Sequence, residues 1–189
     1  MSIAATRKID FKSAKDNQGR TALIEASCCG KLGIGRILLK DDRVDVNAKD
    51  NDGRTALIWA SRYGHEEVVR ILLKDDRVDV TAKDDDGRTA FILAIKYDHE
   101  EVVRIFLMDD RVDVNGKDDD GRTALIWASR YGHEDVVRML LKDDRMDVNA
   151  KDNQGRTALI EASCCGSTEK RERRILLTSK SVSSTRIST

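Results

Sequence analysis

Residues 50–83 read DNDGRTALIWASRYGHEEVVRILLKDDRVDVTAK, and residues 118–151 read DDDGRTALIWASRYGHEDVVRMLLKDDRMDVNAK, so two distant blocks differ at only five positions. The tripeptide GRT recurs every 34 residues along the chain, at Gly19, Gly53, Gly87, Gly121 and Gly155. A fixed period of this length is typical of solenoids, in which each unit packs only on its neighbours. We therefore expect an array with units at 16–49, 50–83, 84–117, 118–151 and a divergent unit at 152–177.

Each unit carries the signals for one turn and two short helices. In the second unit, DNDGRT is turn chemistry, and Thr55 is placed to cap a helix over residues 56–63. Gly64 should end that helix in a left-handed conformation, which the Asp98 of the third unit can also adopt. In the second helix, over residues 66–74, the expected buried stripe is Val68, Ile71, Leu72 and Leu73. Since one unit cannot bury its own apolar side, the pattern predicts an all-α repeat solenoid with β-turn fingers.

The two ends of the chain depart from the pattern. Residues 151–166 are identical to residues 15–30, but the text that follows reads STEKRERRILL. We expect residues 168–177 to form a C-terminal capping helix; the alternative is the degenerate end of a longer array. An N-terminal arm over residues 1–15 should precede the array, with Ile9 and Phe11 covering the first repeat. A disordered tail over residues 178–189 should follow it, because it has almost nothing to bury.

Composition bounds the partners. The net charge is zero with 36% charged residues, which gives no reason to expect nucleic acid or an anionic membrane as the main partner. No apolar run reaches the roughly 20 residues that cross a bilayer, so membrane insertion is not expected. The first ten residues lack the apolar stretch of a secretion signal. We expect an intracellular monomer, cytoplasmic in the simplest case, with a nuclear location left open.

The repeated unit resembles the ankyrin repeat. The resemblance rests on TALIWA at residues 55–60, followed by Gly64-His65, Leu72-Leu73 and Asp79-Val80. Ala replaces the family's proline, Ile replaces its signature histidine, and the period is one residue longer than about 33. The resemblance implies a β-turn and two antiparallel helices per unit. It also implies a non-enzymatic scaffold or adaptor that binds another protein on the concave face, with no cofactor.

One face of the first helix is a candidate binding surface. Trp59, Arg62 and Tyr63 lie at positions i, i+3 and i+4, away from the face that carries Leu57 and Ala60. Along the array the first of these positions holds Glu25, Trp59, Leu93, Trp127 and Glu161. Because one position accepts both Glu and Trp, we expect it to lie outside the deep core.

Trp, Tyr and Arg are also the residue types enriched at interface hot spots. The candidate partner-binding residues are Arg54, Trp59, Arg62, Tyr63, Arg88, Lys96, Tyr97, Arg122, Trp127, Arg130 and Tyr131. The alternative is that Trp and Tyr pack between repeats while Arg pairs with the turn Asp.

Two other functions remain open. The column of Arg that follows each turn Gly could bind an anionic ligand, nucleic acid or phosphoinositide, although the neighbouring turn acids oppose this. The chain could also be part of a longer array with no function of its own. The resemblance further implies that Asn in the DVN position can be hydroxylated, which nominates Asn47, Asn115 and Asn149.

Motifs that suggest metal or redox chemistry fail on spacing. HEEVV at residues 65–69 lacks the second histidine of a zinc helix, and KDDDG at residues 83–87 lacks the acids of a calcium loop. The four cysteines form two adjacent pairs, 28–29 and 164–165, which the register places four repeats apart. They are therefore too far apart for a disulfide or a shared metal, and we expect no catalytic residue and no metal site.

Overall fold

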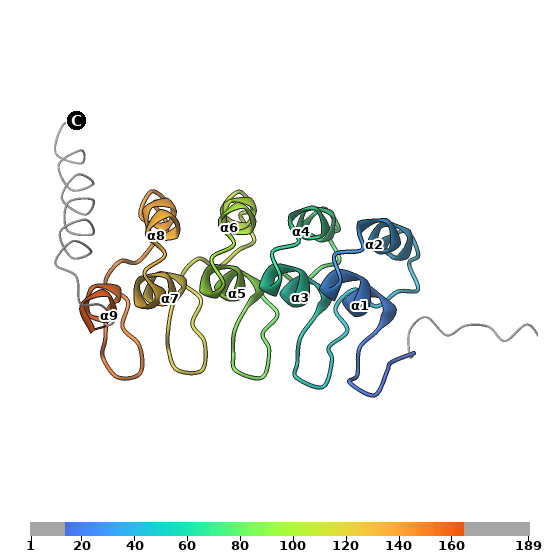
Figure 1. The fold of residues 1–189 in the computed structure, drawn as a ribbon, viewed down its shortest axis with the longest axis horizontal. Helices are drawn as coiled ribbons and strands as arrows, with labels where there is room; N and C mark the ends of the chain where they lie inside the picture. The colour runs from blue at the N-terminus through green and yellow to red at the C-terminus, as the bar shows by residue number, and fades with distance from the viewer. Residues whose placement is uncertain (1–13, 165–189) are drawn as a thin grey trace, which may run out of the picture.

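The computed structural model describes residues 14–164, and these form an array of helix pairs. The first helices of successive repeats are α1 (Ala22–Cys28), α3 (Ala56–Arg62), α5 (Ala90–Lys96), α7 (Ala124–Tyr131) and α9 (Ala158–Cys164). The second helices are α2 (Leu32–Leu39), α4 (Glu66–Leu73), α6 (Glu100–Leu107) and α8 (Glu134–Leu140). Figure 1 shows two parallel rows of helices, with the connecting fingers projecting beneath the first row. The predicted all-α repeat solenoid is confirmed. The expected capping helix over 168–177 and tail over 178–189 lie outside the described residues, as does most of the N-terminal arm.

The first helix of each interior repeat begins and ends as the sequence predicts. The Thr55 hydroxyl accepts a hydrogen bond from the Ile58 amide at 3.3 Å, and the other repeats reproduce this cap. Gly64 ends the helix with φ 70°, and Asp98 adopts φ 61° at the same position of the third repeat. Within residues 14–164, β-structure is limited to one isolated bridge between Lys83 and Thr89, and no helix there is long and apolar enough to span a bilayer.

The core runs between the two rows of helices, and its boundary differs from the predicted stripe. On α4 the buried residues are Val68, Val69 and Leu72, whereas Ile71 and Leu73 are only half-buried. The correction has a geometric reason: the face of α4 that is turned toward α2, α3 and α6 carries Val68, Val69 and Leu72, and Ile71 and Leu73 lie at its edges. Ile71 points back toward the preceding repeat, where its Cδ1 would lie 3.3 Å from a Cβ placed on Gly35.

Side chains of each repeat cap the helix ends of the repeat before it. His65 Nε2 donates to the carbonyl of Cys28 at 3.0 Å, at the end of α1. Arg77 Nη2 donates to the carbonyl of Leu39 at 2.8 Å, at the end of α2. These carbonyls have no hydrogen-bond donor within their own helices, as at every helix C-terminus, and the next repeat supplies the donor. The equivalent histidines and arginines repeat both contacts further along the array.

The Arg that caps the second helix is itself held by an acid. Asp75 accepts from Arg77 Nε at 2.9 Å and Nη2 at 2.6 Å, which fixes the guanidinium plane beside the helix end. The hydrogen bond from Arg77 lowers the pKa of the Asp75 carboxyl, and the same pairing lowers the pKa of Asp109 and Asp143. The DDR segment of the second, third and fourth repeats is therefore a preformed cap for the preceding repeat.

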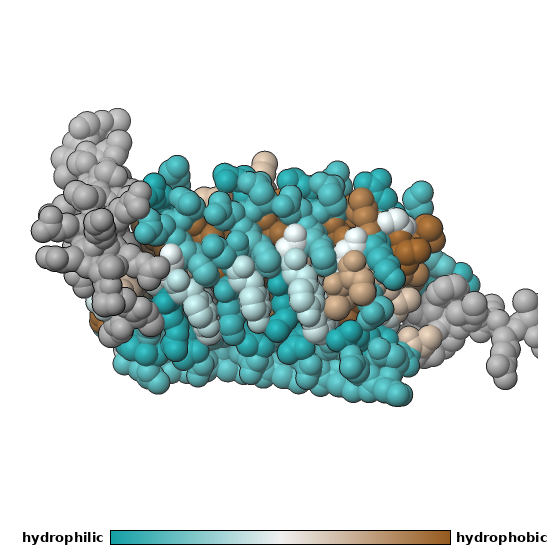
Figure 2. All heavy atoms as spheres, viewed as in Figure 1, coloured by the Kyte–Doolittle hydropathy of each residue, from teal (hydrophilic) through white to brown (hydrophobic). Residues whose placement is uncertain are grey.

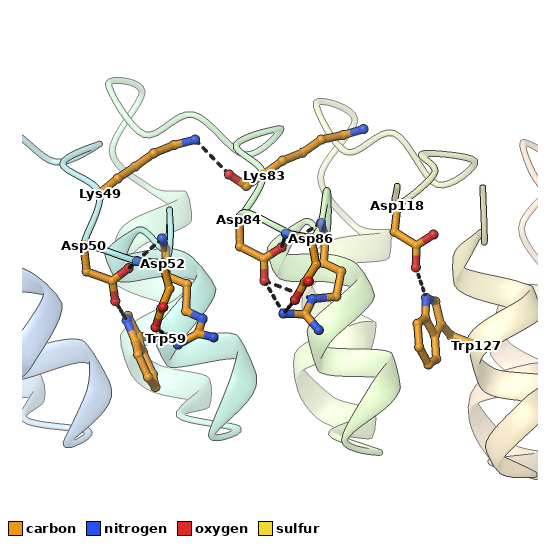
Figure 3. A network of polar contacts seen from close by, with 11 residues as sticks. Lys49, Asp50, Asp52, Trp59, Lys83, Asp84, Asp86, Asp118 and Trp127 are labelled. Carbon is orange, nitrogen blue, oxygen red and sulfur yellow. Dashed lines mark hydrogen bonds and ion pairs between the residues drawn. The ribbon is translucent and has the colours of Figure 1, made fainter. Parts of the chain in front are cut away.

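The fingers are joined by a second set of links. Lys49 Nζ donates to the carbonyl of Lys83 at 2.8 Å, and equivalent lysines make the same bond at every described repeat boundary (Figure 3). The Asp85 amide donates to the carbonyl of Asp52 at 3.1 Å, so neighbouring turns also bond through their backbones. Each boundary is thus held by hydrogen bonds as well as by the apolar core.

Substituting Gly64 tests the turn between the paired helices. A Cβ added to Gly64 would lie 2.5 Å from His99 Nδ1, and the residue holds a positive φ. We expect Gly64→Ala to lower the free energy of unfolding by about 1–2 kcal/mol, through left-handed strain and a displaced histidine. Urea denaturation followed by circular dichroism measures the change.

Gly33→Ala is the matched control. Gly33 lies within α2, and a Cβ there meets no atom within 4 Å. It should raise stability by about 0.5–1 kcal/mol, because Ala favours a helix interior over Gly. Equal effects of the two variants would show that the close approach of His99 is not what requires Gly64.

Candidate functional site

A buried Asp organises the turn of the second to fifth repeats and the residue that faces it, whereas the equivalent Asp16 of the first repeat is exposed. Asp50 Oδ1 accepts from the amides of Asp52 at 3.0 Å and Arg54 at 2.8 Å. Its second oxygen accepts the indole N–H of Trp59 at 2.7 Å, and Asp118 holds Trp127 in the same way at 2.8 Å (Figure 3). The carboxylate is therefore saturated by donors from its own repeat, as burial of a charge requires.

The third repeat satisfies its finger Asp by a different donor. Leu93 replaces Trp and has no N–H to offer, and Arg88 turns onto Asp84 with Nε at 3.0 Å and Nη2 at 2.8 Å. In the second repeat, by contrast, Arg54 pairs with Asp52 at 2.7 Å, and its buried Nε has no hydrogen-bond partner. The residue on the first helix thus decides which acid the finger Arg binds.

The prediction that the helix position of Trp59 lies outside the deep core is wrong. Trp59 is 4% exposed, Trp127 5%, Leu93 0% and Glu161 1%, so the position lies in the core of the described repeats except at Glu25. Glu161 is tolerated there because Arg156 Nη1 lies 2.7 Å from its carboxylate and Arg130 lies 3.9 Å away. The sequence did not reveal the hydrogen-bond partners, the finger Asp for Trp and the Arg for Glu, that allow one buried position to hold Glu, Leu or Trp.

The tyrosines carry the exposed part of the candidate surface. Tyr63 stacks on Trp59 with ring centroids 5.6 Å apart and planes at 12°, and Tyr131 stacks on Trp127 in the same way. Tyr63 is 49% exposed, Tyr97 38% and Tyr131 45%. Each Trp is therefore a rigid base on which an accessible Tyr is held, an arrangement that costs little side-chain entropy when a partner binds.

Cations from the preceding repeat lie over these rings. Arg62 lies 4.8 Å from the ring centroid of Tyr97, and Lys96 lies 4.8 Å from that of Trp127. Within residues 14–164, neither Arg62 nor Lys96 forms an ion pair. Burial, followed by the charges of Arg88 and Arg62, lowers the pKa of Lys96. We call Arg62, Tyr63, Lys96, Tyr97, Arg130 and Tyr131 the tyrosine–cation row.

The candidate finger arginines are engaged within the protein. Arg54 binds Asp52, Arg122 binds Asp120, and Arg88 binds both Asp84 and Asp86. The structure therefore brings the candidates together in two layers. The finger Arg and the Trp form the supporting layer, and the tyrosine–cation row lies above it. The sequence feature that could have predicted this supporting layer is the Asp that begins every turn, at positions 16, 50, 84, 118 and 152.

Two of the candidate modification sites serve the repeat boundaries. Asn47 donates to the carbonyl of Arg77 at 2.7 Å and accepts from the Asp79 amide at 2.8 Å. Asn115 makes the corresponding pair of bonds to Arg145 and Asp147. Asn149, the third candidate, is exposed.

Metal-ligating and nucleophilic residues are dispersed. Within the described part of the chain, no three His, Cys, Asp or Glu residues lie close enough to hold a metal ion. Cys28 is half-buried and Cys29 exposed, both as free thiols, and burial raises the pKa of Cys28. The side chains of the second cysteine pair lie outside the described residues. The three histidines occupy the helix-capping positions and contribute to stability.

The exchange between Trp and Arg at the finger Asp can be tested by a double-mutant cycle. In Trp59→Leu, Arg54 is expected to turn onto Asp50 as Arg88 turns onto Asp84, which limits the loss of stability. In an Arg54→Gln background the same change leaves the buried Oδ2 of Asp50 without its indole donor and without the guanidinium that would replace it. We expect Trp59→Leu to cost about 1–2 kcal/mol more in that background, measured by urea denaturation. Strictly additive effects would contradict the exchange.

The comparisons with known proteins agree with this architecture. A family model described as ankyrin repeats (3 copies) matches residues 4–84, 43–118, 77–152 and 107–180 in overlapping copies. None of the curated proteins compared matches the chain. Ankyrin repeats generally mediate protein–protein interaction and are typically non-enzymatic. With its family match spanning almost the whole sequence and its helix pairs stacked at a fixed period, the chain belongs to the ankyrin repeat family.

Proposed function

We propose that the chain is a non-enzymatic scaffold that binds a partner protein through the tyrosine–cation row on the concave face. The observation that carries this proposal is the division of labour within the first helices. Trp59 and Trp127 are buried and hydrogen-bonded, whereas the tyrosines stacked on them keep almost half of their surface exposed. Rigid, half-exposed tyrosines beside Arg are typical of interface hot spots.

The charges of the row favour a partner segment with acidic side chains. Arg62 and Lys96 form no ion pair within the described residues, and each is held over a ring of the next repeat. A partner carboxylate placed between them would gain two charge-assisted hydrogen bonds, and no existing pair would be broken. Aromatic side chains of the same segment could lie on the exposed edges of Tyr63 and Tyr97.

The alternative function, binding of nucleic acid or phosphoinositide through the finger Arg column, is less well supported. Arg54, Arg88 and Arg122 are already paired with turn carboxylates, so a phosphate would have to displace an acid and then face it. Salt dependence separates the two functions, because affinity for phosphates falls steeply as salt is raised. A partner that the array releases completely at moderate salt, and that ribonuclease or lipid extraction removes, would favour the alternative.

The experiment is an affinity capture with the full chain, followed by titration of the captured partner against variants of the row. Tyr97→Ala and Arg62→Gln should each raise the dissociation constant about tenfold or more, while leaving the circular dichroism spectrum unchanged. Trp59 is not a suitable probe, because removing a buried, hydrogen-bonded indole also destabilises the fold.

Matched controls lie on the opposite row of helices. Met108→Ala removes a side chain that is 80% exposed, and Arg70→Gln removes a cation that faces Glu67 at 3.7 Å. Both controls should bind the partner as the unmodified chain does. If the row variants bind with unchanged affinity, the partner does not use the concave face.

Hydroxylation of the DVN asparagines remains a prediction, and their contacts predict the order in which the three residues would be modified. Asn47 and Asn115 are each held by two hydrogen bonds to the next repeat, whereas Asn149 is exposed. We expect an asparaginyl hydroxylase to modify Asn149 first, with mass spectrometry of timed digests as the measurement. Modification of Asn47 at an equal rate would show that the boundary contacts do not protect it, and unmodified Asn at all three positions would end the idea.

A further inference from the structure

The same sequence block occurs at both ends of the array in two different environments. Residues 14–30 and 150–166 are identical over 17 positions. In the fifth repeat this block sits on the repeat before it, and in the first repeat no described repeat precedes it. The structure therefore shows how the face of the first repeat docks, because a copy of that face is docked elsewhere in the chain.

The docked copy is held by specific contacts. Helix α9 packs against α7, and Lys117 Nζ donates to the carbonyl of Lys151 at 2.8 Å. Asn153 donates its backbone amide to Asp120 O at 3.0 Å and its side-chain amide to Asp119 O at 2.9 Å. We call the surface that contacts this block, formed by α7, Asp119 and Asp120 of the fourth repeat and by Lys117 just before it, the seat. The seat therefore binds the finger of the block as well as its helix α9.

The first repeat presents the same face to solvent. The Glu25 side chain is 51% exposed, whereas that of its counterpart Glu161 is 2% exposed. Ile34 is 49% exposed, although Val68 at the same position of the second repeat is 3% exposed. Ile37 is 67% exposed, and its counterpart there is the residue that reaches back to Gly35. Figure 2 shows apolar side chains gathered at the end of the array that carries α2.

The described part of the fifth repeat leaves apolar side chains exposed on the block itself and on the fourth repeat. Leu159 is 47% and Ile160 44% exposed, whereas Leu23 and Ile24, the same residues in the first repeat, are each 1% exposed. Val148 of the fourth repeat is 47% exposed, while its counterparts in the earlier repeats are buried. A following repeat with a full apolar second half would cover Val148, and the first repeat has such a half in α2 and Val44.

We propose that the first repeat of one copy of this chain docks on the fourth repeat of a second copy, in the seat that α9 of the second copy otherwise occupies. The identical block preserves the finger contacts, so Asn17 takes the place of Asn153 and Glu25 faces Arg130. Helix α2 then packs beside α8, which removes Ile34, Ile37 and Val148 from water. The association is head to tail, and it extends beyond two copies unless an end is blocked.

Covalent linkage of α9 to its seat makes the association dependent on concentration. A tethered segment competes at an effective concentration in the millimolar range, so dilute protein remains monomeric as the sequence analysis expects. The incoming repeat buries apolar side chains that the displaced block leaves exposed, which favours exchange as the chain concentration rises.

Sedimentation velocity of the full chain from about micromolar to about millimolar concentration tests the proposal. We expect assemblies that grow with concentration. Ile34→Glu/Ile37→Glu blocks the exposed face of the first repeat, which we call the head. Val148→Glu blocks the docking surface on the fourth repeat, which we call the tail of the array. Each variant should remain monomeric. All three residues are exposed in the monomer, so the fold should persist. Met108→Glu, at an equally exposed site on the far row, is the control and should assemble as the unmodified chain does.

Mixing the two blocked variants gives the sharpest outcome. One variant keeps an intact tail and the other an intact head, so the mixture should form a complex limited to two chains. In that complex, the backbone amides of residues 158–164 of the Ile34→Glu/Ile37→Glu chain should exchange with deuterium faster than in its monomer, because α9 of that chain has left its seat, whereas those of the Val148→Glu chain should be unchanged. Glu25→Lys, which places a cation opposite Arg130, is a second head variant should the double Ile substitution unfold the first repeat.

Three results would overturn the proposal. The unmodified chain could remain monomeric over the whole concentration range. The head and tail variants could assemble as the unmodified chain does, or their mixture could stay monomeric, which would exclude a head-to-tail contact. Assembly with unchanged exchange at residues 158–164 would place the contact away from the α9 seat.

Discussion

The carbonyl groups at the ends of the short helices are the constraint on which the structure depends. Helices of seven or eight residues leave most of their terminal carbonyls without an internal partner, and burial between repeats removes water as an alternative. In this array His65 and Arg77 of one repeat satisfy the helix ends of the repeat before it. The repeats are therefore coupled by a requirement for hydrogen bonds as well as by apolar burial. A single repeat removed from the array would lose both.

The finger Asp solves a related problem in the turns. Its carboxylate is buried, so each repeat must supply donors, and the amides of the turn provide most of them. The last donor is either the indole of Trp59 or the guanidinium of Arg88. This choice allows the helix position above the turn to change without leaving a buried charge unpaired. This buried position can thus vary while the fingers stay in register.

The period of 34 residues and the turn and cap residues predicted the fold, because those signals are local: Thr55 caps a helix wherever the next four residues are helical. The burial of Trp59 could not be predicted in the same way. It depends on Asp50, nine residues earlier, and on Arg20 of the preceding repeat, whose guanidinium lies 4.7 Å from the Trp59 ring centroid. Reading Glu and Trp at one position as a sign of exposure assumed a common environment. In fact, Arg156 and Arg130 make that environment different for Glu161.

Repeats that differ at few positions show which residues are free to serve binding. The Lys, His and DDR residues that link neighbours recur in the second, third and fourth repeats, so partner recognition cannot vary there without loosening a boundary. The third repeat changes Arg62 to Lys96 on the concave row and Lys74 to Met108 on the far row, and the helix-end bonds at residues 62 and 96 use the backbone carbonyls, not the side chains. The third repeat also changes buried residues, such as Trp59 to Leu93 and Leu72 to Phe106, so variation is not confined to the surface. The pairs Arg62/Lys96 and Lys74/Met108 form the set whose side chains change without altering a boundary bond. The concave members of that set are the ones that lie over an aromatic ring of the next repeat and form no ion pair in the described part of the chain.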